Sequence, residues 1–160
     1  MKESIIDRSI AELQRKGLRF SIDEVARSLK ISKKTVYKFF TTKEDLAVAI
    51  YKTFYDKAID RIGSIEDSLA KREAATQLLT VYFQSHCMIR DDIFNKYALN
   101  DSIRALAQEG HDRIKARIRE ILPQSDGAAL MIIIDGSMRR LVESEENAEK
   151  VIERLAMLIC

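Results

Sequence analysis

The residues best suited to chemistry lie in one short stretch, SKKTVYKFF, at positions 32–40. Its lysines can neutralise phosphates, its hydroxyl groups can donate to phosphates or base edges, and its threonine methyl group can contact thymine. The acid-free segment is longer than this stretch, because residues 27–43 contain six Lys and Arg and no Asp or Glu. This pattern indicates contact with a polyanion.

The distribution of charge supports the same interpretation. The 160 residues have a formal net charge of +2, yet residues 1–62 carry 14 Lys and Arg against 9 Asp and Glu, a balance of +5. The remaining residues carry 13 against 16, a balance of −3. A basic N-terminal part on a mildly acidic remainder is typical of a protein whose N-terminal part meets a polyanion.

The sequence contains no pattern that predicts catalysis. His86 and Cys87 are adjacent, so on a helix they point about 100° apart and are poor partners for one metal ion. His111 and Asp112 are neighbours in the same way. No glycine-rich phosphate loop, HExxH motif or serine elbow is present. We therefore expect a protein that is not an enzyme and that has no cofactor and no metal site.

Composition bounds the fold and the cellular compartment. One proline and five glycines leave long helices uninterrupted, and the apolar run at residues 128–134 is too short to span a bilayer. The two cysteines lie far apart, and the first ten residues contain no apolar signal region. These features predict a reduced, cytoplasmic, helix-rich protein that does not contact a membrane.

Capping signals place the basic stretch on the third of three N-terminal helices. Apolar residues recur at helical spacing over residues 3–16, and SIDE at 21–24 is a capping box that starts a helix over 22–29. Ser32 can cap a third helix over 33–39, and Thr42 a long fourth helix over 43–62. About three residues join the second and third helices, which is the spacing of a helix-turn-helix.

The third helix should have one buried and one exposed side. Val36 and Phe40 are four residues apart and are expected to be core, with Phe39 as a further packing residue. The other side chains should point outward and fit a DNA major groove. These predicted contacts are Lys33, Lys34, Thr35, Tyr37 and Lys38. A solvated basic helix with an aromatic edge is the alternative.

Taken in order, these elements resemble the TetR/AcrR-type bacterial transcriptional regulators. The family pattern is a first helix ending in Gly, an "IA" or "VA" pair, a recognition helix of the form S-K-x-T-hydrophobic-Y-x-x-F, and K-x-x-L. Here it is met by Gly17, Val25-Ala26, SKKTVYKFF and Lys43–Leu46. The resemblance covers roughly the first third of the chain. It implies DNA contacts from Thr35, from Tyr37 to a phosphate, and from Lys43 to the DNA backbone.

Two positions depart from the family pattern. Lys30 stands at the turn position that the family usually fills with Gly, so the backbone there must accommodate a Cβ atom or the turn must differ. Lys34 stands where the family often has Gly or Ala. The base preference of a relative therefore cannot be transferred to this chain.

The remaining residues also have the pattern of helices, over 66–88, 91–99, 102–122, 126–142 and 147–159. The fold class is therefore all-α. We expect residues 1–46 to form a helix-turn-helix DNA-binding domain, helix 43–62 to connect, and residues 47–160 to form a helical ligand-binding and dimerisation domain.

The last two predicted helices carry more apolar surface than one small domain can cover. Residues 130–142 are apolar on nearly all sides for a turn and a half, and residues 151–160 have an apolar face. The resemblance implies that these helices pair with their copies in a homodimer that binds a palindromic operator. The predicted interface residues are Met131, Ile134, Met138, Leu155 and Leu158. Packing within one chain is the alternative.

The resemblance also implies a pocket for a small-molecule effector in the C-terminal domain. Its predicted lining residues are Phe54, Tyr82, Phe83, His86, Phe94, Tyr97 and His111. An ordinary core role is the alternative for each of them. Their apolar and aromatic character favours a hydrophobic or amphipathic effector.

The leading hypothesis is a sequence-specific, homodimeric repressor that a ligand releases from its double-stranded DNA operator by a population shift. The alternative is a helical small-molecule- or partner-binding protein with non-specific DNA affinity. Thr35, Tyr37 and Lys43 favour the first hypothesis, because all three occupy contact positions of the family pattern.

Overall fold

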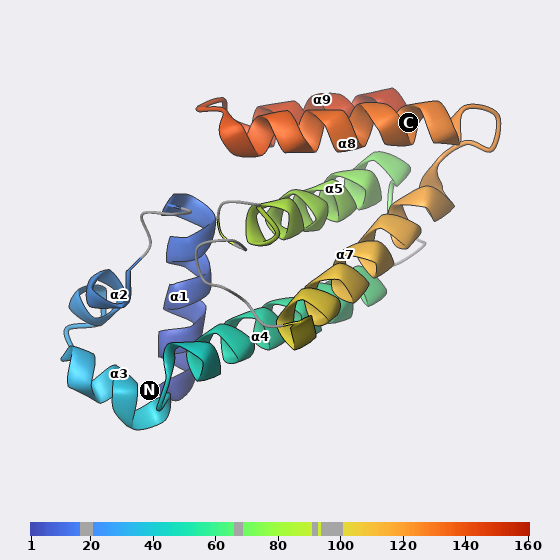
Figure 1. The fold of residues 1–160 in the computed structure, drawn as a ribbon. Coiled ribbons are helices and arrows are strands. Elements are labelled where there is room, and N and C mark those ends of the chain that lie inside the picture. The colour runs from blue at the N-terminus through green and yellow to red at the C-terminus, as the bar shows by residue number, and fades with distance from the viewer. Residues whose placement is uncertain (17–20, 66–68, 91–92, 94–100) are drawn as a thin grey trace. The chain divides into compact units, whose positions relative to one another are not determined.

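The computed structural model describes residues 1–16, 21–65, 69–90, 93 and 101–160 (Figure 1). Over these residues the regular structure is α-helical, with no strand among them. The helices are α1 Lys2–Lys16, α2 Ile22–Ser28, α3 Lys33–Phe39, α4 Lys43–Gly63, α5 Lys71–Met88, α7 Asp101–Ile121, α8 Gly127–Glu143 and α9 Ala148–Ile159. The predicted all-α fold class is confirmed.

The chain divides into two compact units. The first combines Met1–Asp56 with Cys87–Gln108, and the second combines Lys57–His86 with Glu109–Cys160. The helices α4, α5 and α7 each contribute residues to both units. The predicted boundary after residue 46 stays a prediction.

In the first unit the N-terminal helices α1, α2 and α3 pack through apolar side chains, with α2 in contact with both α1 and α3 (Figure 1, blue). Their buried apolar residues are Ile5, Ile6, Leu13, Val25, Ala26 and Val36. Together with Ser9 and Glu12, the buried residues of α1 recur at three- to four-residue steps, which puts them on one face of the helix. Ile10 is only half-buried, and Glu12 shares the buried face instead.

In the second unit α8 and α9 lie side by side (Figure 1). The buried side of α8 consists of Met131, Ile134, Met138 and Leu141. The buried side of α9 consists of Ile152, Leu155, Ala156 and Ile159. Because both sets follow helical spacing, each helix has a second side left for other contacts.

The helix boundaries follow the sequence signals closely, with one correction. The helix predicted to begin at residue 66 begins at Lys71, since the carbonyl of Ala70 accepts from the amides of Glu73 at 2.8 Å and Ala74 at 3.1 Å. A carbonyl that accepts such bonds marks the N-terminal cap of a helix. The cap predicted at Gly17 and the helix predicted over 91–99, Ile93 apart, lie outside the described residues.

Candidate nucleic-acid interface

The turn that leads into α3 is a helix C-terminal motif with Lys30 in the left-handed region. Lys30 has φ 55°. Its amide donates to the carbonyl of Arg27 at 3.1 Å, and the amide of Ile31 donates to the carbonyl of Ala26 at 2.9 Å. This bond pair is the Schellman arrangement, in which Gly usually takes the left-handed position. The turn therefore keeps the conformation that glycine favours, although a lysine occupies it.

Ser32 fixes the beginning of α3 as predicted. Its hydroxyl oxygen accepts from the amide of Thr35 at 3.1 Å and lies 2.9 Å from the hydroxyl oxygen of Thr35. Both hydroxyl groups are thus engaged with each other at the first turn. Thr35 is half-buried, so its side chain is partly available at the surface.

The rest of α3 divides into a buried and an exposed side. Val36 and Phe40 are buried, as predicted, whereas Lys34 and Lys38 are exposed and Tyr37 is half-buried. The prediction that Phe39 is a packing residue is wrong, because its side chain is 41% exposed. At 100° per residue, Phe39 lies about 60° from Val36, which puts it at the edge of the buried side and not within it.

Lys33 is exposed, but it is also tied to α2. Its Nζ atom donates to Oδ2 of Asp23 at 3.1 Å, and both side chains are about half exposed. Exposed ion pairs of this kind contribute about 1 kcal/mol or less and weaken with salt. The pair leaves Lys33 able to exchange Asp23 for another anion.

A reciprocal capping box begins α4 immediately after α3. The amide of Asp45 donates to the Thr42 hydroxyl oxygen at 3.0 Å, and the amide of Thr42 donates to Oδ2 of Asp45 at 2.9 Å. Such a box satisfies two amides that would otherwise lack partners and fixes the angle at which the chain enters the helix. The predicted contact residue Lys43, which is exposed, therefore stands at a well-defined helix start.

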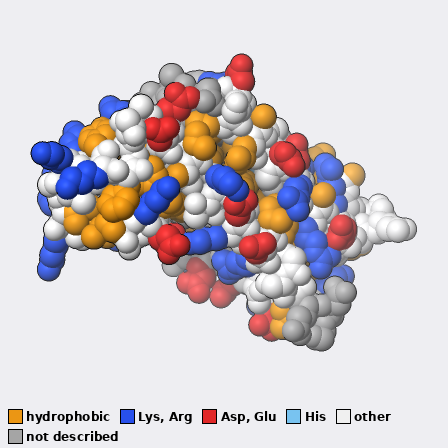
Figure 2. All heavy atoms as spheres, turned by 90° about the horizontal axis from the view of Figure 1, so that it is seen from below, with side chains coloured by type: hydrophobic (Ala, Val, Ile, Leu, Met, Phe, Trp, Pro, Cys, Tyr) orange, Lys and Arg blue, Asp and Glu red, His pale blue; other side chains and the backbone are white. Residues whose placement is uncertain are grey.

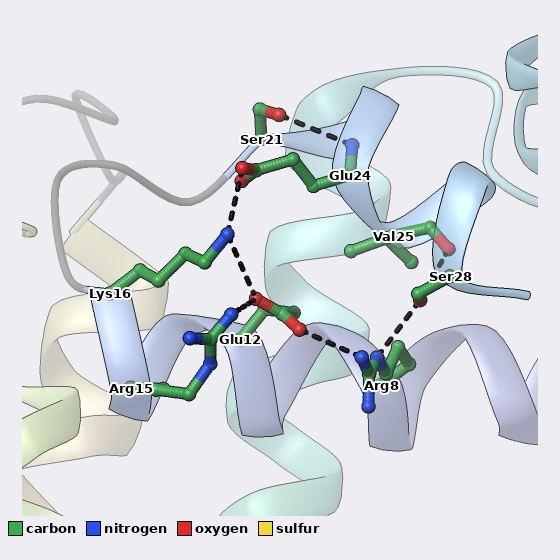
Figure 3. Close-up of polar contacts among 8 residues, drawn as sticks. All are labelled: Arg8, Glu12, Arg15, Lys16, Ser21, Glu24, Val25 and Ser28. Carbon is green, nitrogen blue, oxygen red and sulfur yellow. Dashed lines mark hydrogen bonds and ion pairs between the residues drawn. The ribbon is translucent and has the colours of Figure 1, made fainter.

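A polar network joins α1 to α2 behind the turn (Figure 3). Glu12 is 4% exposed, and its carboxylate meets Arg8 at 3.0 Å, Arg15 at 3.0 Å and Lys16 at 3.6 Å. Lys16 also donates to Glu24 of α2 at 2.7 Å. The hydrogen bond from Lys16 keeps the pKa of Glu24 below its ordinary value.

Serine side chains complete this network. The Ser21 hydroxyl accepts from the amide of Glu24 at 3.2 Å, which confirms the predicted N-cap of α2. At the other end of α2, Arg8 donates to the Ser28 hydroxyl at 2.9 Å, which itself donates to the carbonyl of Val25. Buried carboxylates require such partners. The network holds α1 and α2 together and so positions the turn that presents α3.

The surface around α3 is basic. Figure 2 shows Lys and Arg side chains gathered where α2 and α3 lie, with apolar side chains between them. The exposed bases of this region are Arg27, Lys30, Lys33, Lys34, Lys38 and Lys43. A cluster of one sign on a short helix and its flanking turns is the electrostatic footprint of nucleic-acid binding.

The structure brings together three of the predicted pocket residues in the second unit. The rings of Tyr82, His86 and His111 have centroids 4.6–4.9 Å apart, with Tyr82 stacked on His111 and both edge-on to His86. His86 Nε2 is buried without a hydrogen-bond partner, whereas Nδ1 of His111 lies 2.8 Å from the hydroxyl of Ser85. Burial lowers the pKa of each histidine to about 4, so both rings are neutral at pH 7.

A charged pair that the sequence did not reveal borders these rings. Tyr82 donates to Oδ1 of Asp135 at 2.5 Å, and Lys115 donates to Oδ2 at 2.5 Å. Burial opposes the ionisation of Asp135, but the hydrogen bonds from Lys115 and Tyr82 outweigh it and lower its pKa. Burial and the bond to Asp135 both raise the pKa of Tyr82. No periodicity links these residues, because they come from α5, α7 and α8.

The structure describes two of the other predicted pocket residues, Phe54 and Phe83. Phe54 is buried in the first unit, Phe83 is half-buried on α5, and Phe94 and Tyr97 lie outside the described residues. A pocket lined by all seven residues stays a prediction.

The residues predicted to form a dimer interface are mostly buried within the chain. Met131, Ile134, Met138 and Leu155 are at most 6% exposed, whereas Leu158 is 63% exposed. The large apolar residues of these helices that are exposed are Ile132 at 74%, Ile133, Met157 and Leu158. The sequence pattern marked the two helices as rich in apolar surface but did not separate the inner side from the outer side. The contact of Met131, Ile134, Met138 and Leu155 with a second chain stays a prediction.

Three short helices with a capped turn and a basic exposed α3 define a helix-turn-helix protein. Residues 5–50 match the family model described as "Bacterial regulatory proteins, tetR family". The N-terminal part of the chain therefore carries the helix-turn-helix of the TetR family, as the sequence pattern predicted. Members of this family are regulators and not enzymes, which agrees with the expectation from the sequence.

Similar proteins agree with this assignment. The "Fatty acid metabolism regulator protein" of Bacillus subtilis is 22% identical over 157 residues, which cover 95% of this chain and 73% of that protein. The HTH-type transcriptional regulator YuxN of the same organism is 33% identical over 90 residues, or 53% of this chain and 31% of that protein. Two HTH-type regulators of Mycobacterium tuberculosis match over 86 residues, and the match spans 37% of their length.

Solved structures show the same fold over almost the whole chain. A TetR-family regulator from Bordetella parapertussis has a TM-score of 0.65 at 18% identity and covers 99% of this chain and 93% of its own. A regulator of the same family from Aquifex aeolicus has a TM-score of 0.61 at 23% identity and covers 98% and 95%. Over the described residues, no helix is both long enough and apolar enough to cross a membrane.

Proposed function

We propose that this chain is a repressor that binds a palindromic DNA operator as a homodimer and is released by a small molecule. The observation that carries the DNA-binding part is α3 itself. It presents Lys34 and Lys38 outward, it is capped by Ser32, and no acid lies between Arg27 and Lys43. A basic helix held rigidly after a tight turn can enter a major groove with its lysines near phosphates.

The DNA contacts that we assign are Lys33, Lys34, Thr35, Tyr37, Lys38 and Lys43. Lys34, Lys38 and Lys43 supply charge, and the phenol of Tyr37 can donate to a phosphate. Lys33 would exchange Asp23 for a phosphate, which costs little because the ion pair is exposed.

Dimer formation is supported by the outer side of α8 and α9. Ile132 and Ile133 on α8 and Met157 and Leu158 on α9 are exposed, and the two helices are in contact. Four large apolar side chains on adjacent helices are costly to leave in water and are suited to a self-complementary two-fold contact. A two-fold dimer would place two copies of α3 on successive turns of DNA.

A small-molecule effector is supported by the relatives and by the rings of the second unit. One relative is named for fatty acid metabolism, and a solved structure of the same fold is a multidrug binding protein, EbrR, complexed with malachite green. In this chain His86 leaves one buried nitrogen unpartnered beside Tyr82 and His111. A ligand that forms a hydrogen bond with this nitrogen would bind the conformation that has space for it and would shift the population toward that conformation.

Fluorescence anisotropy tests this function. The labelled duplex is the DNA upstream of the protein's own gene, and the control is a shuffled duplex of equal length and composition. We expect the upstream duplex to bind at least about 10³-fold more tightly. We also expect oleate or malachite green to lower that affinity. Equal weak binding to both duplexes would favour the alternative of non-specific DNA affinity.

A further inference from the structure

Phe39 is exposed in a place where an exposed phenyl ring needs an explanation. Over the described residues it is the only aromatic side chain among the large hydrophobic residues with high exposure. The next residue, Phe40, is 3% exposed and carries Lys2 5.6 Å above its ring. Two adjacent phenylalanines therefore have opposite environments. Packing accounts for Phe40 and does not account for Phe39.

Helix geometry places Phe39 beside the basic surface of α3. Residues four apart share a side of a helix, so Phe39 follows Thr35 on one row and Lys38 follows Lys34 on the next. Both lysines are exposed, and residues 27–43 contain no acid. An apolar row thus runs along a helix whose surroundings attract a polyanion.

The Thr35 side chain adds to the apolar character of this row. Its hydroxyl lies 2.9 Å from that of Ser32, which also accepts from the Thr35 amide at 3.1 Å. The hydroxyl of Thr35 already has the Ser32 hydroxyl as its hydrogen-bond partner. The methyl group, which needs no hydrogen bond, is therefore the part of Thr35 suited to an apolar contact. Thr35 and Phe39 together offer a methyl group and a ring edge one helical turn apart.

We propose that Phe39, supported by Thr35, recognises the 5-methyl group of a thymine in the major groove. This inference rests on the proposed DNA-binding function. In the major groove the thymine methyl is the apolar group that distinguishes one base pair from the others, and Thr methyl groups and Phe rings are suited to contact it. Phe39 would thereby act on sequence preference, whereas Lys34 and Lys38 act on affinity for any DNA.

The experiment begins with selection of bound duplexes from a library of random sequence by the full-length protein. The best duplex is then remade with 2′-deoxyuridine in place of thymine, one position at a time, which removes a single methyl group. We expect a loss of about fourfold in affinity at one position in each half-site, the effect of burying one methyl group. Phe39→Ala should lose at least this factor on the thymine duplex and lose nothing further when uracil replaces that thymine.

Lys38→Ala is the matched control on the same helix. It should weaken binding to every duplex and still distinguish thymine from uracil. Circular dichroism on both variants verifies folding, and Phe39→Leu, which keeps an apolar side chain, should retain part of the discrimination. If uracil is tolerated at every position, or if Phe39→Ala remains as sensitive to uracil as the unmodified protein, the assignment of Phe39 is overturned. Selection that enriches no sequence at all would instead contradict the DNA-binding function on which it rests.

Discussion

Lys16 Nζ donates to Glu24 Oε1 at 2.7 Å and so joins the last turn of α1 to the first turn of α2. The same ammonium group lies 3.6 Å from Glu12, whose carboxylate is almost fully buried. The helix-turn-helix is thus held by a charged network on one side and by apolar packing on the other. The network makes the placement of α3 sensitive to single charges in α1.

Glu12→Gln tests that network. The substitution keeps the shape of the side chain but removes the charge that Arg8, Arg15 and Lys16 share, so we expect a loss of about 1–2 kcal/mol in the free energy of unfolding. Urea denaturation measures this value. Glu3→Gln, at an exposed site on the same helix, should change it by less than about 0.5 kcal/mol. Equal effects from the two substitutions would remove the role assigned to Glu12.

Lys30→Gly tests the strained turn. Because Lys30 has φ 55°, a left-handed conformation that costs a non-glycine residue about 1 kcal/mol, glycine should stabilise the protein by up to about 1 kcal/mol despite its greater freedom in the unfolded chain. Lys30→Ala is the control, since alanine keeps the Cβ atom and should give no such gain. Thermal and urea unfolding of the three proteins rank their stabilities. A glycine variant less stable than the alanine variant would disagree with this conformation of the turn.

Leu158→Asp tests the outer side of α8 and α9. Because Leu158 is exposed in the single chain, aspartate there should leave the fold intact, while its burial between two chains should raise the dimer dissociation constant at least about 100-fold. Sedimentation velocity at micromolar concentration should therefore change from dimer to monomer. Glu153→Gln, at another exposed position of α9, should leave the dimer unchanged. A dimer that survives Leu158→Asp must use a different surface.

The buried histidines predict a loss of stability in mild acid. His86 and His111 are the only histidines of the chain, and burial lowers both pKa values from about 6.5 to about 4. Between these pH values the unfolded chain binds protons that the folded chain does not bind. The free energy of unfolding should therefore fall as the pH falls from 6.5 toward 4, by up to about 1.4 kcal/mol per pH unit for each histidine.

Urea denaturation at a series of pH values checks this prediction. His86→Gln and His111→Gln should each flatten the slope between pH 6.5 and 5, because glutamine does not titrate. Carboxylates also titrate toward the lower end, so the decisive quantity is the difference in slope between each variant and the unmodified protein. A slope unchanged by either substitution would mean that the histidines titrate alike in the folded and unfolded chains.

Local signals in the sequence were sufficient for most of the N-terminal fold. Ser21, Ser32 and Thr42 predicted helix starts because their hydroxyl groups bond to amides only three residues away. Contacts that depend on how helices pack were not predictable in this way. From the sequence alone Glu12 is expected to be a surface residue, but in the structure Arg8, Arg15 and Lys16 surround its carboxylate. Asp135 likewise bonds to Tyr82 and Lys115, which lie on helices far apart in sequence.

Where both sides of a helix are apolar, the sequence pattern also could not predict which single side chains are exposed. The spacing to Val36 predicted that Phe40 is buried, but Phe39 lies about 60° from Val36, at the edge of the buried side, where the pattern alone does not decide its exposure. On α8 the run LMIII at residues 130–134 has no polar residue to mark the outer side, so Ile132 and Ile133 could not be distinguished from Met131 and Ile134.

The central claim is that α3 binds DNA, and its most direct test is the salt dependence of binding. The affinity of the double variant Lys34→Ala, Lys38→Ala for the selected duplex is measured against that of the unmodified protein across a salt series. We expect a weaker affinity and a slope of log K against log salt that is smaller by about 2, one for each lost phosphate contact. The variant Lys71→Ala, Lys150→Ala removes the same charge from exposed sites of the second unit and should keep the original slope. Equal slopes for all three proteins would contradict the assignment of α3 as the DNA-binding element.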